Sequence, residues 1–338
     1  MSERRRTRAL SWAGGAALAL LLAPAVVRRL DARRDGDPVP GPAPDLEHIE
    51  LTSADGTRLH MTACGSGPDA LFFVHGWTCN ESVFRFQQEA FRDRYRVYTL
   101  ELRGHGGSAV PASLDYHPDR LAEDLEAAVD FVNPESFVVA GYSLGGFTAF
   151  KWFERFARER EGALKGLAII DSTGIDLVDG LIFGSLVKRF YPAPLSGLLS
   201  VLGRRNRVAG ALKDALKDSS MAYMVVRWGA FGRRPRGEHV EHMREMVFGT
   251  PAPSVPLAAK ACLDYEFRQS LPGVDVPVAL LLGERDKLTD VGSNRRTADL
   301  LPDCRMRVFD GAGHCAMFEN RAEFNEELGA FLEKAFAR

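Results

Sequence analysis

The feature that most constrains the fold of this chain is the alternation of short apolar runs with longer segments of helical spacing. In runs such as ALFFVH at 70–75 and SFVVAGY at 136–142, the odd and the even positions are both mainly apolar. This pattern is typical of strands in a sheet that is covered on both faces. Strands that alternate with helices favour a parallel sheet with right-handed crossovers. The sequence therefore predicts an α/β fold with helices on both faces of one sheet.

The predicted elements follow one another along residues 46–338. A β-hairpin is expected first, at 47–52 and 57–63. Buried strands are then predicted at 70–75, 96–100, 136–142, 164–171 and 276–283, a further strand at 304–309, and helices at 120–132, 144–160, 291–301 and 320–336. The alternation stops between about 174 and 265, where the chain is mainly helical and irregular. That interruption indicates a helical insertion lying over the sheet.

Residues 1–45 differ from this body and are set apart as a signal or membrane-anchor segment with a linker. Nineteen uncharged residues lie between Arg8 and Arg28, and as a helix they would reach about 28 Å, enough to span a hydrocarbon core. The run is consistent with an uncleaved membrane anchor, with a signal cleaved after Ala25, or with a cytoplasmic extension. We therefore expect a membrane-anchored or an exported protein. Residues 35–44 (DGDPVPGPAP) read as an extended linker, and the body is expected to fold without the first 45 residues.

Charge and cysteine usage exclude several kinds of protein. The formal net charge is −2, so no overall field attracts nucleic acid. The five cysteines are odd in number and contain no CxxC pair, which argues against a zinc ribbon or a disulfide framework. The sequence predicts no metal site and no cofactor, and it does not indicate an oligomeric state.

The strongest local signal is a G-x-S-x-G motif centred on Ser143, in Gly141-Tyr142-Ser143-Leu144-Gly145. The motif follows the strand predicted at 136–142 and opens the helix predicted at 144–160. A serine on such a turn takes strained backbone angles and needs small neighbours. These features predict that Ser143 is a nucleophile.

A serine hydroxyl needs a base, and a histidine base needs an acid to hold its tautomer. The predicted base is His314, in a glycine-rich loop after the strand at 304–309. Two carboxylates end buried strands at the same sheet edge, Asp286 and Asp171. Asp286 is preferred because it preserves the order Ser, Asp, His along the chain, and Asp171 is kept as the alternative.

An oxyanion hole is expected from two backbone N–H groups. One belongs to Leu144, directly after the nucleophile, and the other to Trp77, in His75-Gly76-Trp77 after the strand at 70–75. His75 is interpreted as bracing this loop. Arg103 and His105, in LRGHGGS at 102–108, are interpreted as structural.

Together these motifs resemble the α/β-hydrolase superfamily. The resemblance covers residues from about 46 to the C-terminus, through HGW at 75–77, LRGHGGS at 102–108, GYSLGG at 141–146, GERD at 283–286 and GAGH at 311–314. It implies an eight-stranded, mostly parallel sheet with a helical cap inserted after the sixth strand. Glu101 departs from the pattern, because relatives often carry Asp there.

The resemblance and the triad imply a serine hydrolase that cleaves a carboxylic ester, taken from a small molecule or a lipid, through an acyl-enzyme. Other reactions of the same triad stay open: C–C bond hydrolysis, peptide cleavage, perhydrolysis and acyl transfer. A non-catalytic ligand-binding relative is the third alternative. In the insertion, the apolar segment at 181–191 and the arginines at 204, 205 and 207 fit either a lipid-facing surface or an ordinary cap helix.

Overall fold

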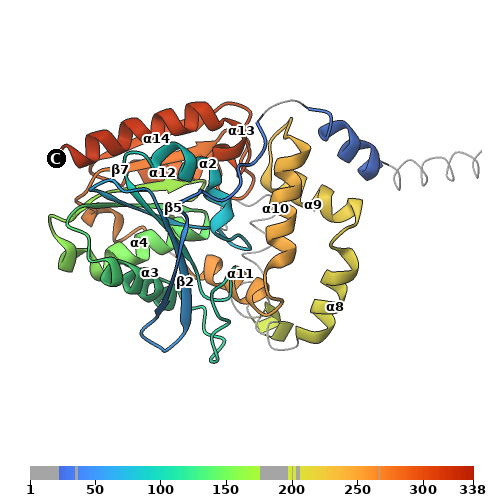
Figure 1. Ribbon diagram of the computed structural model, residues 1–338, viewed down its shortest axis with the longest axis horizontal. Helices are drawn as coiled ribbons and strands as arrows, with labels where there is room; N and C mark the ends of the chain where they lie inside the picture. The colour runs from blue at the N-terminus through green and yellow to red at the C-terminus, as the bar shows by residue number, and fades with distance from the viewer. Residues whose placement is uncertain (1–22, 35–36, 176–196, 200, 203–205, 266) are drawn as a thin grey trace, which may run out of the picture.

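One eight-stranded sheet forms the centre of the molecule (Figure 1). The computed structural model describes residues 23–34, 37–175, 197–199, 201–202, 206–265 and 267–338. The strands are β1 (Glu47–Thr52), β2 (Arg58–Cys64), β3 (Ala70–Val74), β4 (Arg96–Glu101), β5 (Phe137–Tyr142), β6 (Leu164–Ile170), β7 (Val278–Gly283) and β8 (Cys304–Phe309). Their order in the sheet is β1-β2-β4-β3-β5-β6-β7-β8. Only the β1–β2 and β2–β4 pairs are antiparallel, so the predicted mostly parallel architecture is confirmed.

The four helices predicted at stated positions fall close to them, whereas α2 was not predicted. They are α2 (Arg85–Phe91), α3 (Pro118–Val132), α4 (Leu144–Phe156), α8 (Asn206–Leu216), α9 (Ser220–Ala230), α10 (Gly237–Gly249), α11 (Ser254–Asp264), α12 (Val291–Ala298), α13 (Ala316–Glu319) and α14 (Arg321–Phe336). The helix predicted at 144–160 ends as α4 and continues as a 3₁₀ turn at Ala157–Arg160. The helix predicted at 291–301 ends at Ala298, and the last predicted helix is α14, with α13 just before it.

Alternation along the central strands divides the core into two layers. On β3, Phe72 and Val74 point into the layer formed with α3 and α4, whereas Leu71 and Phe73 point into the layer formed with α2 and α14. Side chains of a strand alternate between the two faces of a sheet, so a run without polar residues can supply both layers. This explains why the apolar runs predicted the buried strands.

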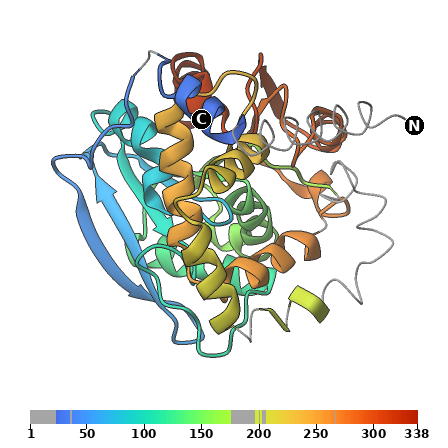
Figure 2. The same ribbon diagram turned by 90° about the vertical axis from the view of Figure 1, so that its right-hand side faces the viewer.

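The predicted insertion follows the sixth strand. Helices α8, α9, α10 and α11 lie between β6 and β7, and in Figure 2 the yellow and orange helices of this cap stand in front of the sheet. The helical cap that the resemblance implied after the sixth strand is therefore confirmed. The apolar segment at 181–191 and the arginines at 204 and 205 lie outside the described residues.

The N-terminal segment contacts the cap. Residues 23–31 form a helix, and its Arg28 guanidinium lies 2.6 Å from the Glu241 carboxylate of α10. Arg34 donates to the Pro235 carbonyl at 3.0 Å. No sequence pattern predicted these contacts, and removal of residues 23–34 would break them. The domain boundary at residue 45 stays a prediction.

Among the described residues, no helix combines the length and the apolar character needed to cross a bilayer. Residues 1–22, which hold most of the predicted apolar run, lie outside the described part of the chain.

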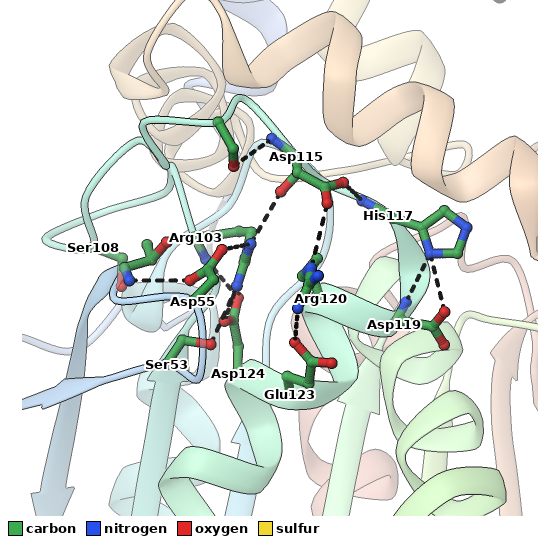
Figure 3. A network of polar contacts seen from close by, with 12 residues as sticks. Ser53, Asp55, Arg103, Ser108, Asp115, His117, Asp119, Arg120, Glu123 and Asp124 are labelled. Carbon is green, nitrogen blue, oxygen red and sulfur yellow. Dashed lines mark hydrogen bonds and ion pairs between the residues drawn. The ribbon is translucent and has the colours of Figure 1, made fainter.

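A buried ion pair fixes the loop after β4 (Figure 3). The side chain of Arg103 is fully buried, and its guanidinium donates to both oxygens of the Asp124 carboxylate, at 2.6 and 2.7 Å. A further N–H lies 2.8 Å from the Asp55 carboxylate, and another donates to the Ser53 hydroxyl at 3.2 Å. This network agrees with the structural interpretation of Arg103.

Replacing Asp124 with asparagine is expected to lower the free energy of unfolding by about 3–5 kcal/mol, because the buried Arg103 guanidinium would lose its fully buried bidentate partner and keep only the partly exposed Asp55. The matched control is Asp119→Asn on the same helix, where the carboxylate is 41% exposed beside His117. An exposed pair contributes up to about 1 kcal/mol. Urea unfolding curves measure both values, and similar losses for the two variants would contradict the prediction.

Candidate active site

Ser143 occupies the sharp turn between β5 and α4. Its φ is 50° and its ψ is −114°, a strained conformation for a residue other than glycine. The turn is held on both sides of the residue: the N–H of Ser143 donates to the Ile170 carbonyl at 2.9 Å, and the Ser172 hydroxyl donates to the Ser143 carbonyl at 2.8 Å. The strained backbone predicted from the motif is thus present.

Small neighbours make this turn possible. A Cβ atom on Gly141 would lie 2.3 Å from the Gly145 carbonyl oxygen, and one on Gly145 would lie 1.9 Å from the Val74 carbonyl oxygen. Neither contact is sterically allowed for a larger residue. The two glycines of the motif are therefore required by close backbone approach, as the sequence predicted.

His314 reaches Ser143 from the loop after β8. Its Nε2 lies 2.9 Å from the Ser143 hydroxyl oxygen, and its Nδ1 lies 2.7 Å from an oxygen of Asp286. The imidazole is buried, with 4% exposure. Burial lowers the pKa of His314, but the charge and hydrogen bond of Asp286 outweigh it and raise the pKa above its ordinary value. With the Nδ1 proton donated to Asp286, Nε2 is free to accept the serine proton.

Asp286 is held in place by its own loop. One of its oxygens accepts from the N–H groups of Leu288 and Thr289 at 2.8 and 3.0 Å, and the other accepts from the Thr289 hydroxyl at 2.6 Å. These bonds leave the second oxygen directed at His314. A carboxylate fixed in this way can hold one tautomer of the histidine.

Asp171, the alternative acid, lies in the same region but bonds elsewhere. Its carboxylate accepts from the N–H of Gly283 at 2.8 Å and from that of Ala316 at 3.0 Å. Burial and the nearby charge of Asp286 raise the pKa of Asp171 well above its ordinary value. Asp171 therefore connects the ends of β7 and of the His314 loop, and Asp286 is the carboxylate in contact with the imidazole.

The loop after β3 lies close to Ser143. A Cβ atom on Gly76 would lie 3.1 Å from the Cβ of Ser143, so the loop passes directly beside the nucleophile. Among the described residues, the backbone N–H groups of Trp77 and Leu144 donate to no other protein group. The assignment of these two N–H groups to an oxyanion hole stays a prediction. The Trp77 indole N–H donates to the Val255 carbonyl at 2.8 Å, which connects this loop to α11.

Two buried histidines hold the loop after β3 in place through hydrogen bonds. His75 Nδ1 lies 2.8 Å from the Gly76 carbonyl oxygen, and its Nε2 accepts from the Leu102 N–H at 3.1 Å. His105 Nε2 accepts from the Thr78 N–H at 3.3 Å. Burial lowers the pKa of both imidazoles, which keeps them neutral and able to accept. The bracing role expected for His75 agrees with these contacts.

Glu319 was not singled out in the sequence, although it contacts the loop that carries His314. Its carboxylate accepts from the Gly313 N–H at 2.7 Å and from the Gly232 N–H, just after α9, at 2.9 Å. Burial raises the pKa of Glu319 to about 7, while the bonds from Gly313 and Gly232 lower it. The only sequence signal was an acidic residue one helical turn after the histidine loop.

Lys287 makes a second connection between the site and the cap. It directly follows Asp286, and its ammonium donates to the Trp228 carbonyl of α9 at 2.5 Å. The Asp286 loop therefore contacts the C-terminal end of α9, and Glu319 connects the His314 loop to the segment just after it. In the described part of the chain, no cluster of three or more metal-ligating side chains occurs.

A serine, a histidine and a carboxylate in hydrogen-bonded series at the carboxyl edge of a mostly parallel sheet define the class of α/β-fold hydrolases. Comparison with known families agrees. The profile of the Alpha/beta hydrolase family matches residues 71–327, and this chain belongs to that family.

The relatives of known activity that it resembles are distant. A pimeloyl-[acyl-carrier protein] methyl ester esterase from Chromobacterium violaceum is 26% identical over 82% of this chain and 98% of its own length. An N-formylmaleamate deformylase from Pseudomonas putida is 25% identical over 83% of this chain and 95% of its own length. A thermophilic esterase from Thermogutta terrifontis has the same fold, with a TM-score of 0.68 and 20% identity over 86% of this chain and 99% of its own.

Proposed function

We propose that this protein is a serine hydrolase that cleaves carboxylic esters through an acyl-enzyme, with Ser143 as nucleophile, His314 as general base and Asp286 as the orienting acid. The observation that carries the proposal is the unbroken series of two hydrogen bonds from Asp286 to His314 and from His314 to Ser143, at 2.7 and 2.9 Å. The esterases among the relatives support an ester as the substrate.

In the first half-reaction, the hydroxyl oxygen of Ser143 attacks the ester carbonyl carbon and gives its proton to Nε2 of His314. Asp286 stabilises the imidazolium that forms. The negative charge on the carbonyl oxygen is accepted by the free N–H groups of Leu144 and Trp77. Collapse of the tetrahedral intermediate expels the alcohol, which takes its proton from His314 and leaves the acyl group on Ser143.

In the second half-reaction, His314 removes a proton from a water molecule, and the resulting hydroxide attacks the acyl carbon. The same two N–H groups accept the charge of the second intermediate. Its collapse releases the carboxylic acid and returns the proton to Ser143. None of these steps requires a metal or an organic cofactor, so a chelator should leave turnover unchanged.

Attachment to a membrane through the N-terminal run is a second part of the proposal. Its support is the uncharged stretch of nineteen residues between Arg8 and Arg28, which is long enough to cross the hydrocarbon core as a helix. A signal peptide cleaved after Ala25 is the competing possibility. The substrate would then be a small-molecule ester if the active site opens towards the solvent. It would be a lipid ester if the active site opens towards the membrane.

Turnover of p-nitrophenyl esters of graded acyl length tests the enzymatic proposal. We expect hydrolysis of these esters and covalent labelling of Ser143 by a fluorophosphonate, with labelling prevented by prior heat denaturation. Labelling without ester turnover would favour another reaction of the same triad, such as amide or C–C bond hydrolysis. Absence of both would favour a non-catalytic ligand-binding protein.

A further inference from the structure

The helix at residues 23–31 is fastened to the cap by a buried carboxylate. Asp31 is 1% exposed, and it accepts hydrogen bonds from the Arg227 guanidinium at 2.5 Å and from the Tyr223 hydroxyl at 3.0 Å. Both partners belong to α9. Because breaking such a contact would leave a buried charge without its partner, α9 keeps a fixed position relative to the chain just before Asp31.

The proposed membrane segment ends very near this contact. The uncharged run ends at Val27, four residues before Asp31, and four residues of helix rise about 6 Å. If the run crosses a bilayer, α9 must lie within about one helical turn of the membrane surface. At that distance, side chains that α9 exposes to solvent are within reach of the lipid.

Those side chains are apolar. On α9, Met221, Val225 and Trp228 are 57%, 64% and 55% exposed, and their spacing places them on one side of the helix. On the N-terminal helix, Val26 and Leu30 are 52% and 54% exposed. We call these five residues the apolar face.

The distribution of exposed apolar side chains supports a specific surface. Twelve large hydrophobic residues are strongly exposed in the described part of the chain, and nine of them lie in the N-terminal helix or the cap. The other three are Trp77, Val110 and Phe131. Single exposed apolar residues are common on proteins, but a concentration of them marks an interaction site.

Exposed arginines flank the apolar face. Arg29 and Arg33 are exposed on and just after the N-terminal helix, and Arg233 and Arg234 are exposed in the segment that follows α9. Apolar side chains bordered by basic residues suit the boundary between acyl chains and anionic head groups. A soluble protein partner would not explain why the face adjoins the end of the apolar run.

We propose that the apolar face docks on the surface of a lipid bilayer, so that the cap rests on the membrane from which the enzyme takes its substrate. The inference rests on the proposed ester hydrolysis and membrane attachment, and it narrows the substrate to an acyl ester dissolved in the bilayer. The docked helix α9 contacts the Asp286 loop through Trp228 and Lys287, and Gly232, just after α9, donates to Glu319, which also accepts from Gly313 in the His314 loop. The active site therefore lies directly behind the helix that contacts the bilayer.

Site-directed labelling of the full-length protein tests the docking. Val225→Cys and Phe131→Cys would carry an environment-sensitive fluorophore, and the protein would be reconstituted in phosphatidylcholine vesicles with a minor fraction of phosphatidylglycerol. Phe131 is the matched control because it is 58% exposed near the C-terminal end of α3, which belongs neither to the cap nor to the N-terminal helix. Four of the native cysteines are buried and Cys304 is half-buried, and labelling of the unmodified chain gives the background.

We expect lipids with brominated acyl chains to quench the label at residue 225 and to leave the label at residue 131 unquenched. Equal quenching at the two positions would overturn the docking. Hydrolysis of a soluble ester by the same samples tests the enzymatic proposal separately. A wash in high salt tests the attachment, because an inserted apolar helix resists salt. Release of the protein by the wash would show that the N-terminal run does not cross the bilayer, and the docking proposal would then be overturned.

Kinetics provide an independent test. The double variant Met221→Asp with Val225→Asp is expected to hydrolyse a vesicle-borne ester about tenfold more slowly or worse, because two apolar contacts with lipid are lost. Its turnover of a soluble short-chain ester should match that of the wild type. The control pair, Val110→Asp with Phe131→Asp, should leave both rates unchanged. An equal loss in the two pairs, or no loss in either, would overturn the proposal.

Discussion

Replacing Ser143 with alanine is expected to lower kcat for ester hydrolysis by about 10⁶-fold, the scale seen when a triad nucleophile is removed. The hydroxyl of Ser143 is the atom that His314 contacts at 2.9 Å, and alanine offers no atom that can form an acyl-enzyme. The side chain contributes little packing, so the fold should be kept. Ester turnover, fluorophosphonate labelling and the thermal unfolding midpoint together measure the effect.

Ser172 supplies the matched control. Its hydroxyl donates to the Ser143 carbonyl at 2.8 Å, so Ser172→Ala removes a hydroxyl next to the nucleophile without removing the nucleophile. We expect a loss of about 1 kcal/mol of stability for one hydrogen bond and full retention of labelling. Activity near wild type in Ser143→Ala, or loss of labelling in Ser172→Ala alone, would show that the nucleophile is wrongly assigned.

Replacing Asp286 with asparagine is expected to lower kcat by about 10⁴-fold. An asparagine amide directed at Nδ1 of His314 would favour the tautomer that carries its proton on Nε2, and that nitrogen could not accept the serine proton. The corresponding change at Asp171 should cost far less activity, because Asp171 bonds to the backbone of Gly283 and Ala316. The two variants assayed side by side decide which carboxylate is the acid, and the reverse ranking would select Asp171.

The pH profile gives a further readout of the same variant. His314 must be neutral to act as a base, so kcat/KM falls as the pH drops through its pKa. In the wild type, Asp286 raises that pKa against the effect of burial. Without the negative charge, burial dominates and the pKa falls. The acidic limb of the residual activity should therefore move to lower pH in Asp286→Asn, and by a smaller amount in Asp171→Asn, because Asp171 raises the pKa of His314 less than Asp286 does.

Much of the fold was predictable because the sequence signals were local. A strand buried on both faces must be apolar throughout, and the runs at β3, β5 and β7 are apolar throughout. The backbone comes so close to its neighbours at the Ser143 turn that only glycine fits on either side, and the glycines of the motif therefore predicted the turn. Parallel strands then bring their carboxyl ends to one edge, which is why Asp286 and His314 could be associated with Ser143 before any distance was known.

Other contacts were not predictable because they depend on where distant segments meet. Asp31 pairs with Arg227 across nearly two hundred residues of sequence, and nothing near either residue distinguishes them from ordinary surface charges. The bond from Gly232 to Glu319 is similar, since it depends on the path by which the cap returns to the sheet. The choice between Asp171 and Asp286 also needed side-chain directions, because both residues end strands at the same edge.

The placement of the cap between two neighbouring strands also determines the order in which the enzyme is assembled. Paired residues of β6 and β7, such as Leu167 and Val278, are about 110 residues apart along the chain, and parallel pairing over such a separation is slow. During synthesis, the segment with Ser143 leaves the ribosome well before those with Asp286 and His314. Until β7 arrives, β6 presents an open edge that other chains can pair with. The growing chain thus carries Ser143 before Asp286 and His314 are present, and its greatest risk of aggregation comes in the interval while the cap is being made.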